Sequence, residues 1–191
     1  MSEQEIYYNT LLQNLGPIMV GILLIPIIIG FINRYALSEL LKIFWIYLIV
    51  LFIVYLFNLL FIWSVNNYYV FFEPFLTKFS IQNTYFLAIL SYTTSIIFTG
   101  YFYSVVFNSL LIKRITVFYI FIAIGIYFFI DGYHDYGSFN ATLLNIFIIT
   151  LSLIFINKAF KTDLNKTFFK NPIVLISFGL LLPNIFQLLF H

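Results

Sequence analysis

The feature that most constrains this chain is a series of apolar runs, each long enough to cross a lipid bilayer as a helix. Six runs occur between short polar or turn-forming segments, at approximately 15–32, 41–63, 84–107, 115–130, 141–156 and 172–190. A bilayer core about 30 Å thick requires about 20 apolar residues per helix. The 191 residues are 63% hydrophobic and only 8% charged, whereas soluble domains are about 25% charged. We therefore predict an all-α membrane protein, a bundle of about six transmembrane helices forming one domain over residues 1–191.

The basic residues predict the orientation of this bundle, because Lys and Arg in short loops are retained on the cytoplasmic side. With the N-terminus outside, eight of the nine basic residues fall inside: Arg34, Lys42, Lys113, Arg114, Lys158, Lys161, Lys166 and Lys170. Only Lys78 falls outside. The N-terminal segment lacks the basic region and cleavage site of a secretory signal, so we expect the first span to be retained. We therefore predict a protein of the inner (cytoplasmic) membrane of a bacterium, with both termini on the outer face of that membrane.

The two longest loops have the pattern of segments that lie at a membrane surface. In the outer loop, Phe72, Phe75, Leu76 and Phe79 recur at helical spacing, which predicts a short helix at headgroup level. In the inner loop, aromatic and aliphatic side chains alternate with four lysines, which favours contact with an anionic leaflet.

Several classes of chemistry are excluded or disfavoured by what the sequence lacks. The chain has no cysteine, which excludes disulfides and thiolate chemistry. The middle of each predicted span has no Asp, Glu, Lys, Arg or His, whereas proton relays place ionisable groups there. The basic residues are not grouped with an aromatic nucleic-acid-reading motif. We expect no nucleic-acid partner, no catalytic residue and no cofactor.

Four amide side chains are predicted to lie in the outer half of the membrane: Asn58, Asn145, Asn184 and Gln187. Together they suggest a small outward-facing polar pocket for a ligand, beside the helix break expected at Pro183. The alternative, which we favour, is that these amides hydrogen-bond neighbouring helices.

One outer loop carries the sequence's internal histidine, His134, between Asp131 and Asp135. A metal site is one interpretation, since carboxylate and imidazole groups are common metal ligands. A glycine-rich turn of this composition is more often a solvated loop, and we favour that interpretation.

The third span carries a stripe of hydroxyl side chains, Ser91, Ser95, Thr99 and Tyr103, at intervals of four residues. Small hydroxyl residues permit close approach and hydrogen bonding between membrane helices, so we predict that this stripe faces another helix. The same interpretation applies to the glycines within the apolar runs, Gly16, Gly21, Gly30, Gly125 and Gly179.

The order of these features resembles a group of uncharacterised small polytopic membrane proteins of Bacteroidota. The resemblance is carried by LIPIIIGFINRY at 24–35, LLK at 40–42, the Lys113-Arg114 pair and KNP at 170–172. Members often carry a Glu in spans three and five, where this chain has Thr93-Thr94-Ser95 and Leu144-Asn145-Ile146, and Ile173-Val174 replaces an aromatic pair. Some members are encoded near sensor histidine kinases, so the resemblance implies a bias toward signalling or accessory roles.

These observations lead to three expectations about function, in order of preference. The first is a non-catalytic subunit or partner of a larger membrane assembly, in contact with lipid and either another membrane protein or further copies of itself. The second is a small transporter or channel that uses the outer polar pocket. The third is an intramembrane enzyme built on His134 and its neighbouring carboxylates.

Overall fold

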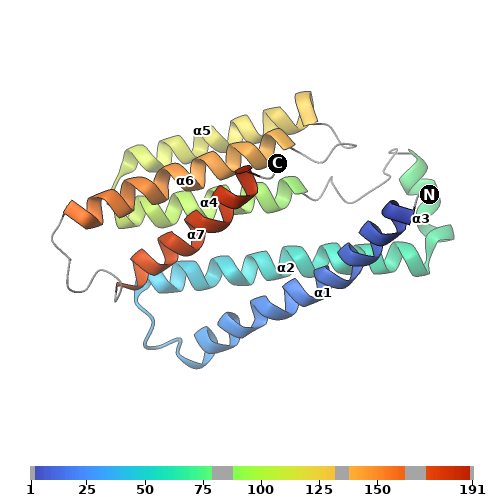
Figure 1. The fold of residues 1–191 in the computed structure, drawn as a ribbon, viewed down its shortest axis with the longest axis horizontal. Helices are drawn as coiled ribbons and strands as arrows, with labels where there is room; N and C mark the ends of the chain where they lie inside the picture. Colours follow the sequence, from blue (N-terminus) through green and yellow to red (C-terminus); the bar gives the residue numbers. More distant parts are fainter. Residues whose placement is uncertain (1–2, 79–87, 132–137, 162–170, 190–191) are drawn as a thin grey trace. The chain divides into compact units, whose positions relative to one another are not determined.

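The computed structural model describes residues 3–78, 88–131, 138–161 and 171–189, and within these ranges every regular element is helical (Figure 1). The helices form two compact units, Met1–Leu87 and Ala88–His191. The first unit holds α1 (Glu3–Ile32), α2 (Glu39–Asn67) and α3 (Tyr69–Lys78). The second holds α4 (Ala88–Val106), α5 (Leu110–Ile126), the π-helical turn η2 (Tyr127–Asp131), α6 (Ser138–Lys161) and α7 (Pro172–Leu189).

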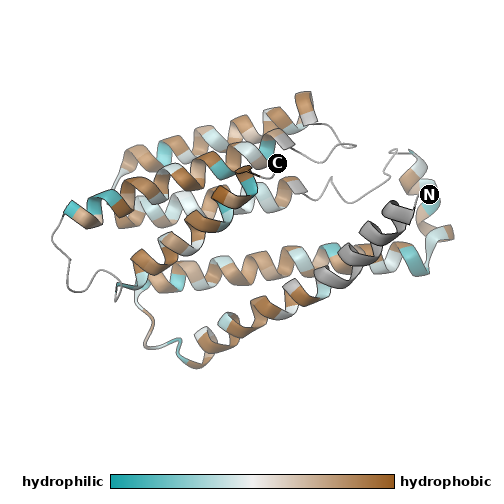
Figure 2. Cartoon of the chain, in the orientation of Figure 1, coloured by the Kyte–Doolittle hydropathy of each residue, from teal (hydrophilic) through white to brown (hydrophobic). Residues whose placement is uncertain are grey.

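Five stretches of helix are long and apolar enough to cross a membrane: Glu39–Asn67, Ile89–Val106, Leu110–Ile130, Phe139–Lys161 and Pro172–Leu189. A shorter apolar stretch, Val20–Ile32, lies in α1. Apolar residues run along most of α2, α5, α6 and α7, while polar residues gather near several helix ends (Figure 2). The predicted class, an all-helical chain compatible with a multi-pass membrane protein, is confirmed. A sixth span, the positions of the termini and the union of the two units into one domain stay predictions.

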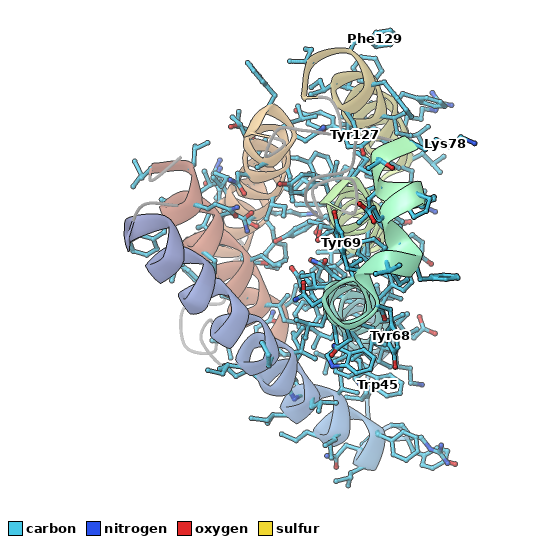
Figure 3. The ribbon with its side chains drawn as sticks, turned by 90° about the vertical axis from the view of Figure 1, so that its right-hand side faces the viewer. Trp45, Tyr68, Tyr69, Lys78, Tyr127 and Phe129 are labelled. Carbon is cyan, nitrogen blue, oxygen red and sulfur yellow. The ribbon has the colours of Figure 1, made fainter. Side chains whose placement is uncertain are left out.

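The first unit is built on the antiparallel hairpin of α1 and α2 (Figure 1). Ser38 caps α2, because its hydroxyl accepts a hydrogen bond from the Leu41 backbone N–H at 3.4 Å, which satisfies one of the free donors of the first turn. The Trp45 indole lies against α1 and donates to the Ile27 carbonyl at 3.0 Å (Figure 3). Gly30 makes room for it, since a Cβ there would overlap the indole.

The short helix predicted in the outer loop is present as α3. Phe72 packs edge-on against Phe61 of α2, with ring centroids 6.1 Å apart, whereas Phe71 is 80% exposed. Phe79 lies outside the described residues. An amphipathic helix with exposed aromatic side chains suits the membrane interface, but α3 is confirmed only as a helix.

In the second unit, α4 and α5 form a tight hairpin. Asn108 adopts a positive φ of 50°, and the backbone N–H groups of Asn108 and Ser109 donate to the carbonyls of Val105 and Ser104 at 3.1 and 2.9 Å. This pattern is a Schellman motif, in which a left-handed residue ends the helix. The Ser109 hydroxyl then caps α5 by accepting from the Ile112 N–H at 3.5 Å.

The two helices of this hairpin approach closely at Gly100, where a Cβ would overlap the Thr116 side chain of α5. The π-helical turn η2 continues α5, with Tyr127 buried and Phe129 90% exposed. Figure 3 shows Phe129 projecting away from the helix.

The two remaining helices of this unit lie beside α4. α6 packs against α4 and α7, running in the direction of α4 and opposite to α7 (Figure 1). α6 begins and ends outside the predicted span 141–156, because Ser138 and the polar segment through Lys161 remain helical.

Candidate functional site

The second unit contains a line of buried polar side chains where α4, α6 and α7 meet. We call it the polar seam and define it by five of the seven residues with polar side-chain atoms that are at most 2% exposed in these helices: Thr99, Tyr103, Asn145, Ser152 and Ser177. In a membrane, buried polar groups are expensive unless they find hydrogen-bond partners. The seam is therefore the part of the described chain where polar chemistry and burial coincide most strongly.

Tyr103 is the centre of one half of the seam, which it forms with Ser152 and Ser177. Its hydroxyl lies 2.9 Å from Ser152 Oγ of α6 and 3.0 Å from Ser177 Oγ of α7, so one side chain of α4 joins three helices. Aromatic contacts continue the same junction, since Tyr103 and Phe107 each lie close to Phe155 of α6, with ring centroids 6.2 and 6.1 Å apart.

The hydrogen atoms in this junction are ordered in one direction. Ser177 donates to the Ile173 carbonyl at 2.8 Å, so its oxygen accepts from Tyr103. Because a phenol has one proton, Ser152 must donate to the Tyr103 oxygen. The result is a directed chain from Ser152 through Tyr103 and Ser177 to a backbone carbonyl, in which neighbouring hydrogen bonds polarise one another.

The other half of the seam, Thr99 and Asn145, differs because its side-chain polar atoms have no hydrogen-bond partners. Asn145 is 0% exposed, and neither its amide nitrogen nor its amide oxygen has a hydrogen-bond partner. Thr99 Oγ1 also lacks one. A buried donor or acceptor without a partner costs about 1 to 3 kcal/mol in proteins. Such groups are rare and call for a specific explanation.

The contacts of Tyr103 fix the level of Asn145 relative to the other helices. Ser152 and Ser177 share one partner, and α6 and α7 run in opposite directions. Asn145 and Asn184 each lie seven residues, or about 10 Å, from these serines toward the same end of the bundle. They therefore fall at similar depth. On α4, Thr99 lies one turn from Tyr103 toward the same end.

The four amides predicted to form a pocket are found in different settings. Asn58 belongs to the first unit, where it is half-buried with its amide oxygen unpartnered. Asn184 is half-buried, and its amide donates to the Leu180 carbonyl of its own helix at 2.6 Å. Gln187 is exposed. Only Asn145 lies in the seam, and the pocket formed by the four amides stays a prediction.

The other two predicted features are the hydroxyl stripe on α4 and the group of metal ligands. The stripe on α4 is confirmed as a helix-packing feature, because Ser95, Thr99 and Tyr103 are buried and Tyr103 bonds across helices. Of the proposed metal ligands, Asp131 ends η2, whereas His134 and Asp135 lie outside the described residues. Among the residues that are described, no cluster of three metal-ligating side chains occurs.

Sequence reasoning missed Ser152 and Ser177 as members of the seam. Each is a single serine in an apolar run, and serines of that kind commonly bond their own helix. The available signal was their position, because each falls on the same helical face as its neighbour seven residues away, Asn145 or Asn184.

An open groove of 440 Å³ lies between α5 and α6, and its lining is almost entirely apolar. Its lining includes Ile115, Tyr119, Phe147 and Leu151. Such a surface suits a lipid chain.

The chain was compared with protein families, with curated proteins and with solved structures. No family, no curated protein and no solved structure matches it.

Proposed function

We propose that this protein is a non-catalytic subunit or partner of a larger assembly in a bacterial inner membrane, with the signalling bias that the sequence resemblance implies. The observation that carries the proposal is an open glycine in the middle of an apolar face of α7. A Cβ added at Gly179 would meet no atom within 4 Å, which is also true of two other described glycines, one in α1 and one in α5. Around it, Leu175, Leu182 and Phe186 are 53%, 51% and 58% exposed.

The spacing of these four residues places them on one face of α7, at intervals of three and four. Glycine within a helix costs about 0.5 to 1 kcal/mol relative to alanine. A lipid tail gains nothing from that glycine, whereas a second helix gains close approach. Gly30 and Gly100 show how a glycine permits this close approach, since each accommodates a side chain of a neighbouring helix. We infer that Gly179 serves an apolar transmembrane helix of a partner protein.

The membrane orientation is part of the same proposal. Arg34 follows α1, Lys113 and Arg114 lie in the first turns of α5, and Lys158 lies near the end of α6. If the apolar part of α1 crosses the bilayer along with the five longer helices, these residues share the inner side and both termini lie outside. Lys78, in α3, is then on the outer side.

Purification in mild detergent followed by mass spectrometry tests the partner role. We expect a stoichiometric membrane protein with the wild type, and a loss of at least about tenfold in its yield with Gly179→Leu, which corresponds to about 1.4 kcal/mol of binding. Gly100→Leu is the contrasting control, because it should impair folding and lower the yield of the protein itself. A wild-type protein that purifies alone contradicts the proposal.

A small transporter or channel is the second candidate, and the similar depth of Asn145 and Asn184 favours it. Two amides near one level of a bundle supply donors and acceptors to a polar solute. Solute flux into liposomes that contain the purified protein tests this role. Flux that Asn145→Leu abolishes would support it, and the absence of flux for neutral solutes and ions alike would eliminate it.

A further inference from the structure

Asn145 holds two unpartnered polar atoms in a fully enclosed position. Exchange of the amide nitrogen and oxygen, which look alike in most structures, leaves both atoms without partners, so the mismatch does not depend on that assignment. Replacing such a group by an apolar one of the same shape is close to neutral or even stabilising. An amide at this position therefore weakens the closed bundle unless something else bonds to it.

The chemistry of the amide limits what can bond to it. Its oxygen requires a donor, and its nitrogen requires an acceptor. A cation would satisfy the oxygen alone and an anion the nitrogen alone, and the seam contains no charged residue to balance either. A small neutral molecule that both donates and accepts satisfies both atoms. Water is the smallest such molecule, and amides and alcohols share its chemistry.

Near the depth of this position, α7 is interrupted by a proline. Pro183 has no N–H, so α7 lacks one backbone hydrogen bond, the one that would join residue 183 to the Gly179 carbonyl. Asn184 follows it at the depth of Asn145, and its side chain bonds its own helix rather than α6. The part of α7 nearest in depth to Asn145 is therefore joined to the rest of the helix by one bond fewer.

We propose that Asn145 is a binding site for a small neutral hydrogen-bonding molecule, either water or a polar solute, and that the end of α7 beyond Pro183 moves to admit it. The site is independent of the partner role, because Asn145 is buried and lies off the exposed face around Gly179. The site requires no net transport, so binding without flux is consistent with the proposal.

Because the chain has no cysteine, one introduced thiol reports access without background. Full-length Asn145→Cys in liposomes is treated with N-ethylmaleimide, a small neutral reagent. The matched control is Val174→Cys, which is equally enclosed at 0% exposure but precedes Pro183 on α7. We expect Asn145→Cys to react at least about tenfold faster than the control, and Pro183→Ala to slow it severalfold by restoring the missing bond. Equal rates for the two thiols overturn a site for a polar solute, and no effect of Pro183→Ala overturns the route.

The occupant is identified with the native amide in place. Solid-state NMR of the protein with ¹⁵N-labelled asparagine side chains detects magnetisation transfer to Asn145 Nδ2, assigned by its disappearance in Asn145→Leu. Transfer from water alone identifies resident water, and additional transfer from ¹³C-acetamide identifies a solute site. Transfer from neither, together with an Asn145→Leu variant that unfolds at higher temperature than the wild type, overturns the proposal, because the amide is then an empty defect.

Discussion

Removing one hydroxyl at the junction of three helices should weaken the second unit measurably. Tyr103→Phe deletes the oxygen that accepts from Ser152 and donates to Ser177, at 2.9 and 3.0 Å. Side-chain hydrogen bonds between membrane helices average about 0.6 kcal/mol and reach about 1.7. Two of them sum to about 1.2 kcal/mol, with an upper bound of about 3.4. Ser177 keeps its bond to the Ile173 carbonyl, and Ser152 can turn to its own helix, so we expect about 1 to 2 kcal/mol.

The assay is reversible unfolding in mixed micelles of a mild detergent and dodecyl sulfate, followed by circular dichroism. Tyr101→Phe is the matched control, because Tyr101 lies two residues away on α4 but is 48% exposed. The double variant Tyr103→Phe with Ser152→Ala should lose less than the sum of the two single losses, since both remove the same bond. Equal stability of Tyr103→Phe and the wild type, or an equal loss in Tyr101→Phe, would refute the directed chain of hydrogen bonds.

Three further changes test the packing of the two hairpins. Gly100→Ala places a methyl group where the Thr116 side chain lies; we expect a loss of about 1 to 3 kcal/mol in the unfolding assay, partly restored by Thr116→Ala, and no loss would contradict the close approach. Trp45→Phe removes the bond to the Ile27 carbonyl and should cost about 0.5 to 1.5 kcal/mol, measured in the same assay. Asn108 has a positive φ, so Asn108→Gly should be tolerated while Asn108→Ala loses about 1 kcal/mol; the opposite order in thermal unfolding would argue against the left-handed turn.

The helices could be predicted well from the sequence, because a helix that crosses a bilayer requires an apolar run of about 20 residues. Leu51, Phe102 and Leu181, each from one of the predicted runs, lie in long helices of the structure. Their ends were harder to place, as α6 shows, because polar residues such as Lys158 continue a helix when its backbone bonds are already formed. The turn η2 carries no sequence signature of its own, because Tyr127–Asp131 reads as an ordinary apolar run.

The candidate site was predicted only in part, because it depends on which helices are neighbours. The stripe that ends at Tyr103 was visible on α4 alone, but its partners Ser152 and Ser177 lie 49 and 74 residues away. Helices that are apolar on all sides give little indication of which face is buried. Asn145 was expected at an interface with other amides, and its complete enclosure follows from packing against α4 and α7 that no local pattern encodes.

The most direct test of the partner proposal is site-specific photocrosslinking on α7 in native membranes. A photoreactive amino acid at Leu182, which is 51% exposed beside Gly179, should give one discrete adduct with another membrane protein. The same group at Leu181, one residue away but 6% exposed, should give none to another protein. A discrete adduct from Leu182 that disappears with Gly179→Leu is the result we predict. Adducts with lipid alone from Leu182 would contradict the assignment of this face to a partner helix.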